Sequence, residues 1–128
     1  MSKAAWMFQL NGDARGIARK LGEGINTNIF PGQQVMLSVV RVDPHSAGTI
    51  HSHPEEQWGV LLEGKCTRVQ GGEEIEAVAG DFWYTPGGVP HTVRTGDAGA
   101  VIIDIFSPPR DEYKRAGTGF GSATTHGN

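Results

Sequence analysis

The sequence predicts an all-β fold, and its glycine content, its short apolar runs and its spread of aromatic residues are the observations that predict it. Nineteen of the 128 residues are Gly and seven are Pro, so that Gly alone reaches about twice its usual share of ~7%. Because Gly inside a helix costs roughly 1 kcal/mol relative to Ala, this composition argues against a helix bundle. Disorder is also disfavoured, since 38% of the residues are hydrophobic and three Trp, two Tyr and five Phe are distributed along the chain.

Ten runs of β-branched and apolar residues are the expected strands, and turn residues separate most of them. Short strands joined by tight turns fit a sandwich or a small barrel better than a parallel sheet with crossover helices. The expected strands, in order, are Ile17–Leu21, Ile25–Phe30, Gln34–Val42, Thr49–His53, Gln57–Leu62, Cys66–Val69, Glu74–Val78, Asp81–Thr85, His91–Arg94 and Ala100–Phe106. The turn residues between them are Pro31-Gly32, Asp43-Pro44, Glu63-Gly64, Gly71-Gly72, Ala79-Gly80, Pro86-Gly87-Gly88 and Gly96-Asp97.

The two ends of the chain carry weaker signals. A further strand at Trp6–Leu10 is a candidate for pairing with a partner subunit, and a homodimer is expected. One helical turn is expected at Asp111–Arg115, after a stiff Pro108-Pro109. The Gly-, Ser- and Thr-rich residues 117–128 are expected to form a flexible tail behind a single domain of residues 1–116.

Charge and cysteine content exclude several classes of protein. Eleven basic residues against 14 acidic ones give a formal net charge of −3, which is not the basic footprint of a nucleic-acid binder. The uninterrupted apolar stretches are too short to span a bilayer, and the first residues lack the apolar segment of a signal peptide, so a cytoplasmic location is expected. The single Cys66 cannot form an internal disulfide and is expected to be a buried thiol.

His51 and His53 are the first candidate metal ligands. Side chains on a strand alternate between its faces, so these two imidazoles point the same way, and Gln57 keeps their parity four residues later. Imidazole nitrogen suits Zn, Cu, Fe and Ni. Taken alone, the His-x-His pair has the alternative interpretation of two polar residues on a surface.

A second segment, Gly80 to His91, makes the pattern specific. A Gly, a Pro-x-Gly turn and a His follow one another there at fixed spacing. Together the two segments resemble the two motifs of the cupin superfamily, and the resemblance extends over residues 17–106. It implies a double-stranded β-helix, or jelly-roll barrel, that holds one divalent transition metal ion per chain (Zn, Ni, Fe or Mn). The residues that match the motifs are His51, His53, Gln57 and Gly64 in the first, and Gly80, Pro86, Gly88 and His91 in the second; the implied metal ligands are His51, His53, Gln57 and His91.

Three positions depart from the cupin motifs. His45 stands where the first motif begins with Gly, with Gly48 as the alternative turn residue, and Thr95 replaces a closing Asn that is not a ligand. Gln57 replaces the usual Glu, and its neutral amide leaves the ion its full +2 charge. Such an ion is a stronger Lewis acid in a site that is poor for Ca²⁺. The alternative is a degenerate cupin that no longer binds metal.

Asp104 interrupts the apolar run Ala100–Phe106, and Arg110 follows six residues later. A buried carboxylate is costly unless it is paired or linked to a metal, so Asp104 is expected either on a wet surface or in a polar pocket. One interpretation makes Asp104 a general acid or base and Arg110 a binder of a substrate carboxylate. The other is a structural pair of the two residues at the rim of the barrel.

The end of this region is also similar to a group of small cupins, the pectin-degradation proteins that act on unsaturated uronate monosaccharides. The matching residues are Asp104, Phe106, Arg110 and Tyr113. The resemblance implies Asp104 as proton donor or acceptor and Arg110 near the substrate carboxylate, with Phe106 in contact with substrate. Tyr84 is a further candidate for substrate binding, although aromatic residues in strands more often belong to the core.

These observations lead to three hypotheses about function. The first is a metal-dependent enzyme that uses Lewis-acid chemistry, an isomerase, tautomerase or lyase, on a small carbonyl or uronate compound. The second is a cupin-type dioxygenase, and the third is a cupin that binds a small ligand without catalysis. Each has a small molecule as its partner, and none involves nucleic acid or a membrane.

Overall fold

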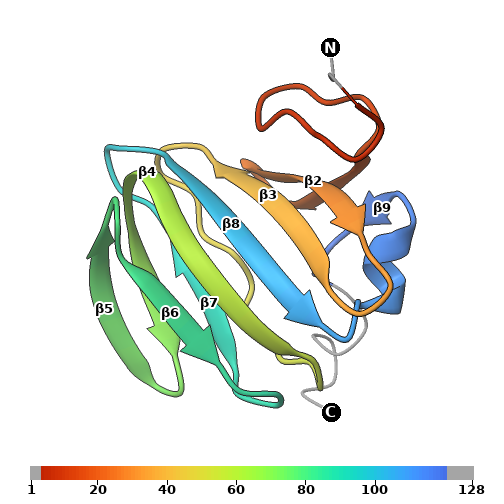
Figure 1. Ribbon diagram of the computed structural model, residues 1–128. Helices are drawn as coiled ribbons and strands as arrows, with labels where there is room; N and C mark the ends of the chain where they lie inside the picture. The colour runs from red at the N-terminus through yellow and green to blue at the C-terminus, as the bar shows by residue number, and fades with distance from the viewer. Residues whose placement is uncertain (1–3, 121–128) are drawn as a thin grey trace.

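The computed structural model describes residues 4–120, and β-strands dominate this part of the chain (Figure 1). The one helical segment within it is a single 3-10 turn, η1, which confirms the helical turn expected at Asp111–Arg115. No helix in the described part is long and apolar enough to cross a membrane. The strands are β1 (Ile17–Gly22), β2 (Ile25–Pro31), β3 (Met36–Val42), β4 (Glu56–Gln70), β5 (Glu73–Val78), β6 (Phe82–Thr85), β7 (His91–Arg94), β8 (Ala100–Ser107) and β9 (Gly117–Thr118), and η1 is Asp111–Lys114.

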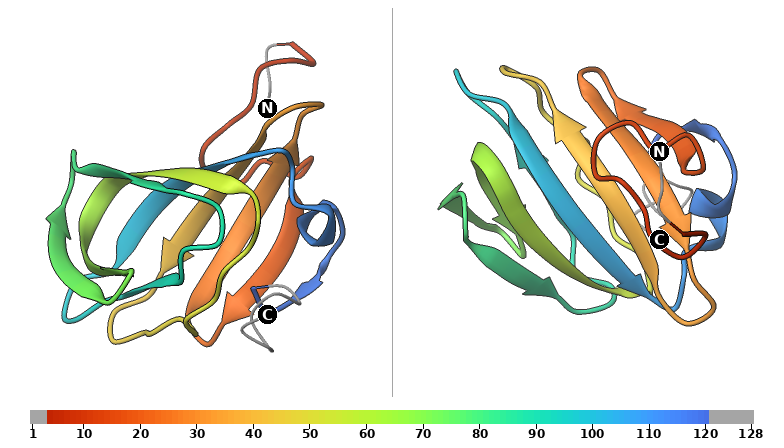
Figure 2. Two further views of the ribbon diagram at one scale, coloured as in Figure 1. Left: turned by 90° about the horizontal axis from the view of Figure 1, so that it is seen from below. Right: turned by 45° about the horizontal axis from the view of Figure 1, so that its top comes forward.

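The strands form one sheet that bends strongly, so that its two halves make two layers facing each other. Its order is β5-β4-β8-β3-β2-β1-β9, with β6 and β7 also paired to β4. The N-terminal half of β4 pairs with β6 and β8, and its C-terminal half pairs with β5 and β7. β4 therefore belongs to both layers, and the strands curve around a common interior (Figure 2). The fold is the predicted jelly roll, with a sheet that is not closed edge to edge.

β4 joins two segments that the sequence divides by a turn at Glu63-Gly64. In the structure the pairing with β8 shifts between Leu61 and Glu63, so one extra residue is accommodated as a bulge. Gly64 lies just beyond it in the left-handed region, with φ +84°. The turn signal was thus real, but it marks a bulge inside one long strand.

Two other expected strands are absent from the described residues. Residues 49–53 contribute only an isolated bridge between His51 and His91, and Trp6–Leu10 forms turns and irregular chain. His45, which stands at the motif's first Gly position, has a φ of 58°, so the backbone there keeps a conformation that favours Gly.

The C-terminal segment begins as ordered chain. β9 pairs in parallel with β1, and Phe120 is buried in the main apolar cluster. Residues 121–128, the rest of the expected tail, lie outside the described residues.

The hydrophobic core lies between the two layers and surrounds the polar side chains that also point into this space. It is apolar and includes Cys66, which is 3% exposed, as the sequence predicted. Its members include Leu21, Ile25, Ile29, Met36, Val40, Val42, Leu61, Cys66, Val93, Ile102, Phe106 and Tyr113.

Candidate metal centre

The two motif segments are joined at the histidines themselves. The amide of His51 donates a hydrogen bond to the carbonyl of His91 (3.1 Å), and the amide of His91 donates to the carbonyl of His51 (2.9 Å). The amide of Gly88 donates to the carbonyl of His53 (2.8 Å). This backbone pairing brings together two candidate ligands, His51 and His91, that lie 40 residues apart in the sequence.

His51, His53 and His91 form a compact cluster. Their metal-binding atoms all lie within 4.8 Å of one another, and the three side chains are buried. In each ring Nδ1 contacts a backbone carbonyl: that of Thr49 (2.9 Å), Glu55 (3.0 Å) and Val89 (2.8 Å), respectively. A carbonyl oxygen only accepts, so Nδ1 carries the proton and Nε2 of each neutral ring keeps its lone pair.

Burial keeps these rings neutral. It lowers the pKa of His51 to about 3, that of His53 to about 4 and that of His91 to about 2. The nearby Arg68 guanidinium lowers all three pKa values further, and that of Arg110 lowers those of His51 and His53. Neutral imidazole is the form that binds a metal.

Gln57 completes the donor set. Its Oε1 lies 3.0 Å from His53 Nε2, and its side chain also hydrogen-bonds to the Asp104 carboxyl. An amide that donates through its nitrogen to a carboxylate must direct its oxygen the other way. The lone pairs of Gln57 Oε1 and His53 Nε2 then face each other with no proton between them. His91 Nε2 also has no hydrogen-bond partner among the described residues. This arrangement of acceptors fits a divalent transition metal ion.

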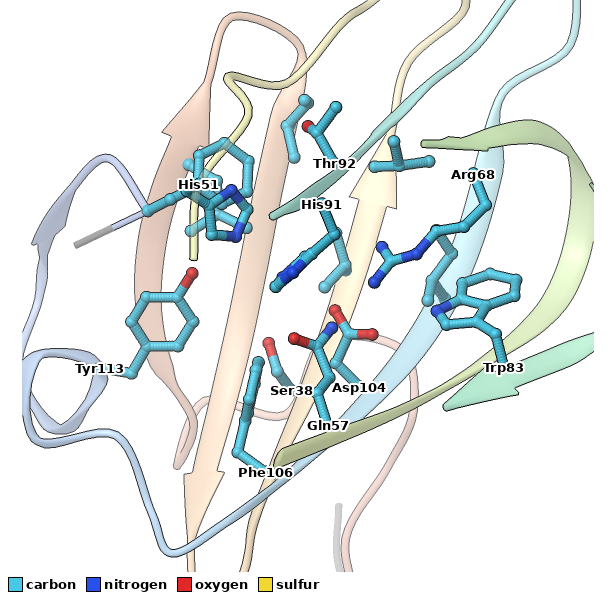
Figure 3. A pocket seen from close by; sticks show the side chains of 16 residues that line it. Ser38, His51, Gln57, Arg68, Trp83, His91, Thr92, Asp104, Phe106 and Tyr113 are labelled. Carbon is cyan, nitrogen blue, oxygen red and sulfur yellow. The ribbon is translucent and has the colours of Figure 1, made fainter. Parts of the chain in front are cut away.

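Asp104 lies beside this donor set. It is on β8, in register with Ser38 of β3 and Gly59 of β4, and its side chain lines the cavity with Gln57 (Figure 3). Desolvation by burial raises the pKa of its carboxyl to about 6. Of the two settings expected for Asp104, a wet surface or a polar pocket, the structure has the pocket.

The cavity has a volume of about 30 Å³, comparable with one water molecule. Phe106 forms part of its wall, with its ring centroid 5.5 Å from that of His53. Phe120 covers the histidine side and stacks on His51 at 4.1 Å between centroids. Phe120 could not be recognised as a site residue from the sequence, because it lies in the segment 117–128, which was expected to be flexible.

Two other predicted site residues do not line the cavity. Arg110 is buried outside the cavity lining, where it donates a hydrogen bond to the Phe120 carbonyl and packs 4.0 Å from the Tyr113 ring. Its Nε is 3.9 Å from a carboxylate oxygen of Glu55 and no pairing with Asp104 is seen. Tyr84 is 40% exposed, and its hydroxyl donates to Glu56. The structure thus places Tyr84 on the outer face of β6, away from the histidines.

Arg68 and Trp83 are cavity residues that the sequence did not identify as functional. Both side chains line the cavity, with the Arg68 guanidinium directed toward His91 and Asp104 (Figure 3). Arg68 is 7% exposed. Its even-numbered parity with the buried Cys66 was the available signal.

Comparisons with known proteins identify relatives of this chain. The chain is 29% identical over 96 residues to the pectin degradation protein KdgF of Dickeya dadantii (strain 3937), which covers 73% of this chain and 87% of that protein. It is 32% identical over 72 residues to the oxalate decarboxylase OxdC of Bacillus subtilis (strain 168), which covers 52% of this chain and 19% of that protein. The chain therefore spans only about a fifth of the oxalate decarboxylase.

Solved structures show the same fold. An RmlC-like cupin from Shewanella frigidimarina NCIMB 400 superposes with a TM-score of 0.73 at 23% identity, over 88% of this chain and 99% of that one. KdgF from a Halomonas species superposes with a TM-score of 0.71 at 26% identity, over 82% of this chain and 96% of that one. The profile of the Cupin domain family matches residues 38–106, and because this match covers more than half of the sequence, the chain belongs to the cupin family.

Proposed function

We propose that the chain is a metal-dependent enzyme that carries out isomerisation, tautomerisation or elimination on a small carbonyl or uronate compound. The observation that carries this proposal is that potential metal ligands and a potential proton carrier lie side by side. Three neutral imidazoles present unprotonated Nε2 atoms on one side, and a carboxyl group with a pKa of about 6 stands beside them.

His51, His53, His91 and Gln57 would hold the ion, which we propose to be Zn, Ni, Fe or Mn. When bound, the ion supplies a Lewis acid that stabilises negative charge developing on a substrate oxygen. All four donors are neutral, so they leave the charge of the ion undiminished. Manganese is included because the oxalate decarboxylase of Bacillus subtilis has manganese(II) centres.

Asp104 is the proton carrier in this proposal. A general acid or base works best when its pKa lies near the working pH, and burial brings the Asp104 carboxyl to about 6. The Gln57 amide, hydrogen-bonded to this carboxyl, holds it beside the donor set. Ser38 and Gly59 flank it on the neighbouring strands, and the missing side chain of Gly59 leaves room for Trp83 and Asp104, because a Cβ there would lie 2.3 Å from Trp83 Nε1 and 3.0 Å from Asp104 Oδ1.

The likeness to pectin degradation proteins supports a sugar acid as substrate. A monosaccharide is larger than a cavity of about 30 Å³. We propose that substrate binding displaces a side chain of the cavity wall, and that this side chain is Phe120, at the end of the described residues.

The metal is tested by elemental analysis of protein purified without an affinity tag, with one ion per chain as the expected result. A His51→Ala, His53→Ala double variant is expected to lose the ion and keep its strand content by circular dichroism. His45→Ala is the matched control, since the His45 side chain is 70% exposed and lies away from the cluster. Metal-free wild-type protein would contradict the proposal.

The chemistry is tested by following conversion of an unsaturated galacturonate monosaccharide with and without oxygen. Asp104→Asn is expected to lower the turnover at least ~100-fold, the lower range of general acid–base effects, with unchanged metal content. Asn keeps an oxygen that accepts the Gln57 hydrogen bond. Loss of metal in this variant would make Asp104 structural, and a requirement for oxygen would favour a dioxygenase.

A further inference from the structure

Arg68 is a buried cation that lacks an ion-pair partner among the described residues. No ion pair of 4.0 Å or less joins it to a carboxylate there. Asp104 acts on it electrostatically, without a hydrogen bond between them. A buried charge is costly unless it is paired, so this guanidinium is a ready counter-charge for an anion.

The other two buried arginines differ in what they bind. Arg19 donates to the backbone carbonyls of Gly119, Thr118 and Glu112. Arg110 donates to the Phe120 carbonyl and lies near Glu55. Both hold the C-terminal segment to the barrel by these contacts, and Arg110 also keeps a buried Nη1 with no hydrogen-bond partner in the described part of the chain.

The partners of Arg68 orient it without neutralising it. Its Nε donates to Gln70 Oε1 (3.1 Å) and its Nη2 donates to Thr85 Oγ1 (2.9 Å), while Thr85 itself donates to Gln70 (2.7 Å). The guanidinium carbon lies 5.2 Å from the centre of the Trp83 ring. Fixed at two nitrogens and packed on an indole, the planar group is held in one orientation toward the cavity (Figure 3).

Trp83 adds a donor to the same wall. Its Nε1 is buried and has no hydrogen-bond partner, as is also true of Asp104 Oδ1. Arg68 and Trp83 line both the cavity and a neighbouring groove of about 400 Å³ between β4, β5 and β6. They therefore form the partition between the cavity and a space large enough for a sugar ring.

We propose that Arg68, with the indole N–H of Trp83, binds the carboxylate of the substrate, and that this subsite selects acids over neutral sugars. The inference rests on the proposed function for the identity of the ligand. Charge supports it independently: the three histidines and Gln57 are neutral, so a divalent ion and Arg68 together leave the cavity positive even when Asp104 is ionised. Arginine also suits a carboxylate because its planar fork can donate two parallel hydrogen bonds.

The test compares binding of galacturonate and galactose by titration calorimetry, in metal-loaded and metal-free protein. Wild-type protein is expected to bind galacturonate at least ~10-fold more tightly than galactose. Arg68→Gln is expected to remove this preference and to leave galactose binding unchanged, and Arg68→Lys to restore part of it. Arg94→Gln is the matched control, because it removes a surface arginine of β7 whose ion pair within residues 4–120 is with Glu74.

Several results would overturn the inference: no preference for galacturonate in wild-type protein, an unchanged preference in Arg68→Gln, or an equal loss in Arg94→Gln. If Arg68→Gln does not fold, Trp83→Phe tests the same subsite, with a weaker hold on galacturonate expected. The proposed function is judged separately. Preferential binding of galacturonate without turnover of any uronate would contradict the proposed function and leave the Arg68 subsite standing. Full turnover of a uronate with an unchanged KM in Arg68→Gln would contradict the subsite and leave the proposed function standing.

Discussion

At the scale of single residues, the backbone decides the protonation state of the candidate ligands. Each Nδ1 of His51, His53 and His91 donates to a carbonyl two residues away in the sequence, at Thr49, Glu55 and Val89. These local bonds fix both the ring plane and the tautomer, a task that often falls to carboxylates around metal-binding histidines. The donor set is consequently neutral as a whole.

Replacing Gln57 by Glu is expected to tighten metal binding at least ~10-fold and to lower turnover. The added carboxylate attracts the ion and reduces its strength as a Lewis acid. Competition with a chromophoric chelator measures the affinity, and a steady-state assay measures the turnover. Gln33→Glu adds the same charge at an exposed position and should change neither. Weaker metal binding in Gln57→Glu would show that Gln57 is not a ligand.

The Cys66 thiol is expected to be unreactive in the native protein. Burial raises its pKa to about 11, and only the thiolate reacts quickly with disulfide reagents. A colorimetric disulfide reagent at pH 8 should therefore titrate no thiol until urea is added. Rapid reaction of the folded protein would mean that the strand around Cys66 opens under native conditions.

The compact histidine cluster could be predicted from residue spacing and the cupin motifs, whereas parity with Cys66 was the one signal for Arg68. The spacing of His51, His53 and Gln57 matches strand alternation, and a Gly/Pro turn before His91 is a local signal. The orientation of Arg68 depends on the bulge in β4. Before the bulge odd-numbered residues such as Gln57 and Leu61 face the interior, and after it Cys66 and Arg68 do. Parity counted from Gln57 would place Arg68 outside, and only parity counted from Cys66 places it inside.

At the scale of elements, β4 is the strand on which both layers depend. It pairs with β8, β6, β5 and β7, and the bulge near Gly64 lets it pass from one layer to the other. The sequence signal at Glu63-Gly64 is the same for a turn and for a bulge, because both need a residue with positive φ. Only pairing with β8, about 40 residues later, distinguishes them.

Gly64→Ala is expected to destabilise the protein by about 2 kcal/mol or more. The residue has a φ of +84°, and a Cβ would lie 1.8 Å from the Gly99 carbonyl oxygen. Left-handed backbone costs a non-Gly residue roughly 1–2 kcal/mol, and the clash adds to that cost. Urea unfolding followed by tryptophan fluorescence gives the free energy of unfolding.

Gly72→Ala separates the two causes. Gly72 has a φ of +86°, but a Cβ there meets nothing within 4 Å. This variant should therefore lose only the backbone term, about 1–2 kcal/mol. Equal losses in the two variants would mean that the strand relieves the clash at Gly64 by a small shift.

At the scale of the whole molecule, the buried site links stability to pH. Burial lowers the pKa of His51, His53 and His91 to about 3, 4 and 2, below the ~6.5 of an unfolded chain. The native state thus binds fewer protons, so these groups contribute stability above pH ~6.5 that is lost as the pH falls toward 4. Asp104, with a pKa raised to about 6, acts in the opposite sense but involves one proton against three.

Metal-free protein is therefore expected to be less stable at pH 5 than at pH 7.5. Urea unfolding in the presence of a chelator measures the difference, and the slope should be shallower in His53→Ala, which removes one of the titrating groups. A free energy of unfolding that rises on acidification would mean that Asp104 outweighs the histidines.

The segment that covers His51 is attached differently from the rest of the barrel. β9 has two register pairs with β1, and the Gly119 amide donates to the Lys20 carbonyl (2.8 Å). The Arg19 side chain supplies further bonds across about 100 residues of sequence. Such a short attachment has a low free energy of local opening compared with β3 or β8. Hydrogen exchange at the Gly119 amide should consequently proceed by a local opening that leaves the barrel folded. Exposure of the histidines and global unfolding are then separate equilibria. Mutations in β9 should shift the first, and mutations in the core should shift the second.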